Sequence, residues 1–215
     1  MGVSWLDNVK AFATFQQIGE EVYRTNTFIQ FGSSSLSLGA AVMLNPGSAN
    51  LKGEAKRKLI QIGAHTDEVA LDKTMKQLVK FMQRTHAKLE GRLYIYNLFY
   101  VKNTIGKEAI ALFESLKSTG NYPTITRPSL SEIQRHPWIL IGWGVERGKN
   151  SSYYELEKKK WLDLIEMSQI PYFGVLSKDN EYYHPNPKGL ANTARLEQLI
   201  QAFKDEIAPL LITKN

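Results

Sequence analysis

A short apolar run that ends in turn residues constrains the fold of this chain more than any other feature. Residues 40–44 are all apolar and lead directly into Asn45-Pro46-Gly47-Ser48. A continuous apolar run of this length is typical of a strand buried on both faces of a parallel sheet. The turn lies at the carboxyl end of that strand, where open α/β sheets bind their ligands. We therefore expect Asn45 at the rim of a pocket; an ordinary strand-to-loop turn is the alternative.

Similar apolar runs alternate with amphipathic segments along the rest of the chain. Strands are predicted over residues 36–44, 93–98, 137–144 and 171–176, and helices over 67–88, 106–117, 153–168 and 192–211. Asp67 and Asp72 are expected to open and support the first of these helices. The alternation predicts an α/β fold with three layers, α/β/α, around a central, mainly parallel four-stranded sheet.

The N-terminal part of the chain is assigned separately. Residues 5–23 carry large apolar side chains at helical spacing, which predicts an amphipathic helix, and residues 27–31 predict a short strand. Residues 47–66 are expected to form a long functional loop with about one helical turn; a solvated surface is the alternative. Because no linker or repeat interrupts the 215 residues, we expect one domain, with a helix and hairpin over 1–36 and a core over 37–215.

Composition excludes several kinds of site. The chain has no cysteine, so disulfides, thiolate zinc sites and cysteine nucleophiles are excluded. Its four histidines are widely spaced, and it lacks the G-x-G-x-x-G, Walker A and G-x-S-x-G motifs, so we expect neither a metal nor a cofactor. We expect no signal peptide, no membrane span and a cytoplasmic location. The net charge of +6 favours polyanionic partners.

A second stiff loop precedes the last predicted helix. Residues 183–189 contain two prolines, and the apolar Leu190 is flanked by Lys188 and Arg195. A rigid loop with an apolar tip and basic flanks could insert into a base stack. The alternative is a proline-rich turn with Asn192 as the N-cap of the helix.

Together these motifs resemble those of the uracil-DNA-glycosylase superfamily, most closely its mismatch-specific, thymine-DNA-glycosylase-like branch. Asn45-Pro46-Gly47 matches the Asn-Pro-Gly first motif of that branch, and Asn186-Pro187-Lys188-Gly189-Leu190 differs from its Asn-Pro-Ser-Gly-Leu second motif only at Lys188. His184-Pro185 is similar to the His-Pro of the strict uracil branch, and the strand ending in Asn97 to the base-reading strand. The resemblance covers roughly residues 38–205. The chain also resembles a little-characterised bacterial family with a Leu-Asn-Pro-Ser-like motif.

The resemblance implies a DNA glycosylase that flips a modified pyrimidine out of DNA, expected to be double-stranded, and leaves an abasic site without a cofactor. Asn45 would position water, Asn97 would read the base, and His184 would hydrogen-bond the leaving base. The base would lie against Pro46, Gly47 and Ser48. The DNA would be held by Asn186, Lys188, Gly189, Leu190 and Arg195.

The base pocket also suggests a substrate. Strict uracil relatives place a bulky aromatic residue near the first motif, where this chain has Gly47 and Ser48. The space would admit a 5-substituted or hypermodified cytosine, such as those of phage DNA, which would make the protein a defence enzyme. Two alternatives remain open: an enzyme acting on a free nucleotide or nucleoside, and a non-catalytic DNA- or protein-binding module. We expect a monomer.

Overall fold

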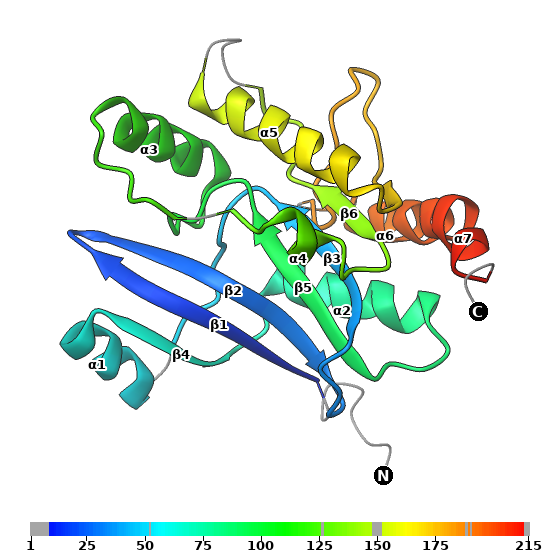
Figure 1. Ribbon diagram of the computed structural model, residues 1–215, viewed down its shortest axis with the longest axis horizontal. Coiled ribbons are helices and arrows are strands. Elements are labelled where there is room, and N and C mark those ends of the chain that lie inside the picture. The colour runs from blue at the N-terminus through cyan, green and yellow to red at the C-terminus, as the bar shows by residue number, and fades with distance from the viewer. Residues whose placement is uncertain are drawn as a thin grey trace.

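A mixed β-sheet organises the computed structural model, which describes residues 9–51, 53–125, 127–147, 152–187, 189 and 191–212. Within these residues the sheet has seven strands in the order β4-β1-β2-β5-β3-β6-β7 (Figure 1). The strands are β1 (Val9–Ile18), β2 (Glu21–Phe31), β3 (Ser37–Met43), β4 (Ala64–Val69), β5 (Gly91–Asn97), β6 (Ile139–Gly142) and β7 (Tyr172–Phe173). The pairs β5–β3, β3–β6 and β6–β7 are parallel, whereas β4–β1, β1–β2 and β2–β5 are antiparallel.

The prediction of a four-stranded, mainly parallel sheet is therefore wrong for the sheet as a whole. The four predicted strands correspond to β3, β5, β6 and β7, which form its parallel half. The antiparallel half is built by β1, β2 and β4, none of which was predicted over its full length.

The predicted helix over residues 5–23 is also wrong: from Val9 onward the chain forms β1 and the start of β2, and residues 5–8 lie outside the described part. The buried side chains of β1 alternate, at Ala11, Ala13 and Phe15, with the period of two that a strand requires. Two of the three are alanines. The larger apolar residues at helical spacing therefore concealed this pattern.

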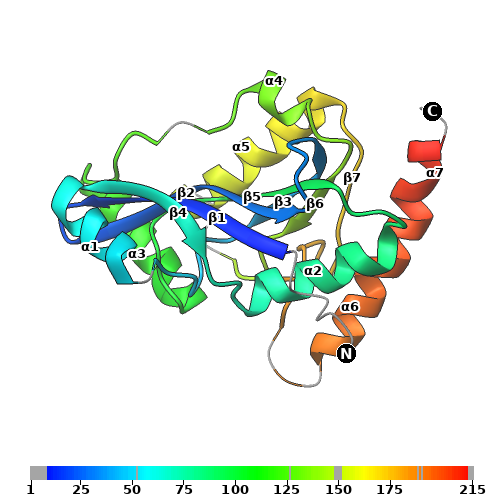
Figure 2. The same ribbon diagram turned by 90° about the horizontal axis from the view of Figure 1, so that it is seen from below.

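Helices cover both faces of the parallel half of the sheet (Figure 2). One face packs against α2 (Lys73–Thr85), α6 (Ala191–Ala202) and the π-helical turn η1 (Phe203–Ile207), which continues into α7 (Ala208–Ile212). The other face packs against α3 (Gly106–Ser118), α4 (Leu130–Ile133) and α5 (Tyr153–Ser168). The remaining helix, α1 (Gly53–Ile62), contacts β1 and β4. A mixed α/β architecture is thus confirmed. The predicted functional loop is wrong over much of its length, because α1 and β4 occupy it. The helix predicted from Asp67 begins only after Asp72, and Asp67 itself lies in β4.

Each face of the sheet has its own hydrophobic core. On the α2 and α6 side, the fully buried ring of Trp138 packs edge-on against the rings of Phe81, Phe173 and Phe203, with ring centres 5.5 to 6.0 Å apart. On the opposite side, Trp161 of α5 is likewise fully buried. No helix in the described ranges is both long and apolar enough to cross a membrane.

Candidate functional site

The carboxyl ends of three parallel strands meet at one edge of the sheet. Met43, the last residue of β3, is in register with Asn97 of β5 and with Gly142 of β6. The amide N–H of Leu98 donates to the carbonyl oxygen of Met43 at 2.9 Å and prolongs the ladder beyond the strands. The loop that begins at Asn45 therefore leaves the sheet beside Asn97.

The side chain of Asn45 is half-buried and fixed by two hydrogen bonds. Its amide nitrogen donates to the carbonyl oxygens of Pro46 at 3.0 Å and of Asn103 at 2.8 Å. With the nitrogen engaged in this way, the side-chain oxygen Oδ1 is the group that can accept a hydrogen bond from a water molecule.

The His184 loop approaches the same edge because glycines line its path. A Cβ on Gly142 would lie 2.8 Å from Cδ of Pro185, and one on Gly144 would lie 3.9 Å from Cβ of His184. The backbone N–H of Asn186 donates to Nδ1 of His184 at 3.1 Å. Burial lowers the pKa of His184, while the charge of Asp72 acts in the opposite direction. The neutral ring with Nδ1 as acceptor carries its proton on Nε2, so His184 is a hydrogen-bond donor there.

Asn97 has a buried side-chain oxygen without a hydrogen-bond partner in the described part of the chain. It is 1% exposed, and its Oδ1 has no hydrogen-bond partner among the residues that the structure describes. A buried acceptor without a partner costs free energy, about 1–3 kcal/mol. A ligand that donates a hydrogen bond to Oδ1 would satisfy this atom.

Asp72 belongs to the site although the sequence analysis assigned it only to the start of a helix. Its Oδ1 accepts the N–H of Met75 at 2.8 Å and caps α2. Its Oδ2 is turned toward the first motif, because a Cβ added to Gly47 would lie 3.3 Å from it. The structure therefore places a carboxylate against the Asn-Pro-Gly turn.

One cation, Arg24, lies near this carboxylate, and a second, Lys102, lies near Arg24; the sequence analysis missed both. Arg24 of β2 is 3% exposed, and its Nη1 donates to the carbonyl oxygen of Ala49 at 3.5 Å. Burial lowers the pKa of Arg24 to about 10, against the opposing effect of Asp72. Burial and the charge of Arg24 also lower the pKa of Lys102. A lone arginine within a strand carries no recognisable motif, so only the fold identifies Arg24.

The residues expected to line the base pocket lie in unequal environments. Pro46 is buried, Gly47 is half-buried and Ser48 is exposed. The carboxylate of Asp72 lies beside Gly47, since a Cβ added there would be 3.3 Å from its Oδ2.

The second loop holds its own shape through polar contacts. The side-chain nitrogen of Asn192 donates to Oδ1 of Asn186, and its backbone N–H donates to the carbonyl oxygen of the exposed Gly189 at 3.2 Å. The guanidinium of Arg195 lies 3.7 Å from the ring centre of Tyr183 and is 9% exposed in all, so it supports the loop more than it offers surface to phosphate. Lys188 and Leu190 lie outside the described residues.

No family model matches this chain, and comparisons with curated proteins and with solved structures likewise give no significant match. Within the described ranges, no group of three histidine or acidic side chains is arranged to hold a metal ion. The chemistry available at this edge of the sheet is therefore that of two amides, a neutral imidazole, one carboxylate and two buried or half-buried cations.

Proposed function

We propose that this protein is a DNA glycosylase that excises a modified pyrimidine and leaves an abasic site, on a three-layer fold of the uracil-DNA-glycosylase type. The observation that carries the proposal is the unpartnered, buried Oδ1 of Asn97 at the strand end beside Asn45, with the His184 loop at the same edge. The short motifs that resemble the superfamily give the same assignment.

The residues suit the charges that develop in glycosidic cleavage. As the C1′–N bond breaks, its electron pair moves to the base, and positive charge develops on the sugar. His184, neutral and protonated at Nε2, would donate a hydrogen bond to the leaving base without forming an ion pair with it. Asn45 would orient the water whose oxygen bonds to C1′ and whose proton leaves to solvent; an amide positions water but is a poor base. Asp72 would place a negative charge near the sugar.

Asn97 would determine which base is accepted. Its amide offers one donor nitrogen and one acceptor oxygen, and the oxygen is the atom without a partner. A base edge that presents a hydrogen-bond donor, as cytosine does through its exocyclic amine, satisfies that oxygen. A 5-substituted cytosine, including the hypermodified cytosines of phage DNA, is the substrate class that we propose.

The proposal is tested with end-labelled duplexes that contain uracil, mismatched thymine or 5-substituted cytosine, together with phage DNA carrying hypermodified cytosine. Alkali cleaves the strand wherever an abasic site has formed. We expect Asn45→Ala and His184→Ala to lower the rate of excision by at least about 100-fold, since each loses a positioned group. Asn121→Ala, which changes an exposed asparagine on a surface connector, is the matched control and should excise at the wild-type rate.

The other outcomes identify other functions. DNA binding without abasic sites on any substrate would contradict the proposal and identify a non-catalytic binding module. Neither binding nor excision would direct attention to a free nucleotide or nucleoside. Excision that persists in Asn45→Ala would place the chemistry elsewhere in the molecule.

A further inference from the structure

An aromatic surface lies on the antiparallel half of the sheet, away from the strand ends described above. Phe12, Phe28 and Tyr94 stand opposite one another on the neighbouring strands β1, β2 and β5. The ring centres of Phe12 and Phe28 are 5.3 Å apart, and those of Phe28 and Tyr94 are 6.0 Å apart. All three rings are half-buried, and none of the described helices lies over β1 and β2 on this side (Figure 1).

A pocket of about 610 Å³ continues this surface toward α4. Its lining includes Phe28, Tyr94, Tyr96, Tyr100, Arg127 and Glu132. The hydroxyl of Tyr96 donates to Oε1 of Glu132 at 3.1 Å, and Arg127 pairs with Glu157 at 3.2 Å. Aromatic walls with a few polar groups suit a planar heteroaromatic ring that also makes hydrogen bonds.

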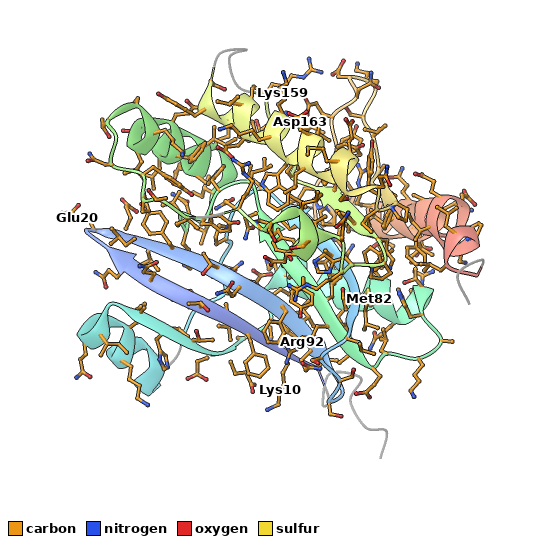
Figure 3. The ribbon with its side chains drawn as sticks, viewed as in Figure 1. Lys10, Glu20, Met82, Arg92, Lys159 and Asp163 are labelled. Atoms are coloured by element: carbon orange, nitrogen blue, oxygen red, sulfur yellow. The ribbon has the colours of Figure 1, made fainter. Side chains whose placement is uncertain are left out.

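Arg92 supplies a cation to this surface. Its guanidinium carbon lies 4.4 Å from the ring centre of Phe28, and its Nε donates to Oε1 of Gln30 at 2.8 Å. Over the described ranges Arg92 makes no ion pair, whereas the nearby Lys10 is paired with Glu68 at 2.8 Å. Lys10 and Arg92 lie at the same end of the sheet (Figure 3). Arg92 is thus a fixed cation with N–H groups available for an anion such as phosphate.

We propose that this face binds single-stranded DNA, with an unpaired base in the tyrosine-lined pocket and a backbone phosphate at Arg92. Bases stack on aromatic side chains whatever their sequence, and arginine held against an aromatic ring pairs with the phosphate backbone. The net charge of +6 favours the same polyanionic partner. This site is separate from the proposed catalytic edge, and the inference does not depend on the glycosylase assignment.

The extent of the surface favours a strand over a free nucleotide. The three rings extend across three strands, and Phe12 lies outside the pocket lining, so the surface offers contact area to more than one nucleotide. A free nucleotide would be held by the pocket alone and would gain nothing from Phe12. Binding should therefore strengthen with oligonucleotide length.

Fluorescence anisotropy with labelled ten-residue oligothymidylate tests the proposal on the full chain. We expect Arg92→Ala and Tyr94→Leu each to weaken binding by at least about fivefold, because each loses a phosphate or stacking contact. The matched controls are Arg84→Ala, on the opposite side of the sheet, and Tyr172→Leu, on the far edge strand; both should bind as the wild type does. Circular dichroism verifies that each variant is folded, and Arg92→Lys provides a milder change at the same position.

Two results would overturn the proposal. One is wild-type affinity in Arg92→Ala, Arg92→Lys and Tyr94→Leu alike. The other is competition by free thymidine monophosphate at the concentration at which the ten-residue strand competes, since that would identify a pocket for a single nucleotide. We expect the Asn45→Ala variant to bind single-stranded DNA with wild-type affinity, whether or not the protein excises bases. Failure of the excision assay would therefore leave the single-strand proposal standing, and failure of single-strand binding would leave the glycosylase proposal standing.

Discussion

At the scale of single residues, Asp72 connects the start of a helix to the candidate site. One of its carboxylate oxygens caps α2, and the other is turned toward Gly47. The negative charge of Asp72 raises the pKa of both Arg24 and His184, against the lowering effect of burial. A helix cap alone would not require a position beside the Asn-Pro-Gly turn.

The two roles of Asp72 can be separated by substitution. Asparagine is as good an N-cap as aspartate, so Asp72→Asn should change the free energy of unfolding by at most about 1 kcal/mol. Excision should nevertheless fall about 10- to 100-fold, because the negative charge near the sugar is lost. Asp72→Ala should lose the cap as well. A wild-type excision rate in Asp72→Asn would restrict Asp72 to its structural role; urea unfolding and the abasic-site assay provide the two measurements.

At the scale of elements, the strand that leads to Asn45 depends on a glycine packed against a tryptophan ring. Gly39 of β3 has a φ of +151°, and a Cβ there would lie 2.2 Å from Cζ2 of Trp138. Trp138 is fully buried among aromatic side chains and cannot move aside cheaply. Beside its ladders with β5 and β6, this close contact therefore helps to fix β3 and with it the position of Asn45.

We expect Gly39→Ala to lower the free energy of unfolding by about 3 kcal/mol, as measured by urea unfolding, because the substitution combines a steric clash with backbone strain. Gly120→Ala is the matched control: Gly120 has a φ of +73° but nothing within 4 Å of an added Cβ, so it should lose only about 1 kcal/mol from strain. Equal losses in the two variants would show that the ring of Trp138 adjusts to the added carbon.

At the scale of the whole molecule, His136 links strands and a helix in one buried network. Its Nδ1 lies 2.7 Å from Oγ of Ser37 in β3, and its Nε2 lies 2.8 Å from the hydroxyl of Tyr96 in β5, which also contacts Glu132 of α4. Burial, and secondly the charge of Arg135, lower the pKa of His136 from 6.5 to about 4. The folded protein therefore keeps this ring neutral.

This pKa makes stability depend on pH. Between pH 6.5 and about 4 the unfolded chain binds a proton at His136 that the folded protein does not, so stability is full above this range and falls as the pH decreases through it. The loss attributable to this ring is about 3 kcal/mol. Urea unfolding between pH 7 and 4 should show that the free energy of unfolding decreases as the pH falls. In His136→Gln this decrease with pH should be less steep. An identical slope in that variant would mean that other groups, such as His86 and His184, whose pKa values are also lowered by burial, account for it.

The parallel half of the sheet and the helices beside it follow from local sequence patterns. Residues 153–168 form α5 as predicted, and the four apolar runs all become strands. The strand ends that carry Asn45 and Asn97 were predictable for the same reason, because a continuous apolar run ended by turn residues has few other stable arrangements. The alternating alanines of β1 gave too weak a signal to compete with the helical spacing of the larger residues.

The sequence alone thus determined the α/β class, the absence of cysteine chemistry and the two loops that carry the motifs, since each depends on residue type and local spacing. Only the tertiary structure decided that the carboxylate of Asp72 lies against Gly47, that Arg24 is buried near it, and that Asn97 has a side-chain oxygen without a partner. It also decided that aromatic residues of β1, β2 and β5 share one surface. These contacts join residues far apart in the chain, and their free energies depend on packing that no local pattern records.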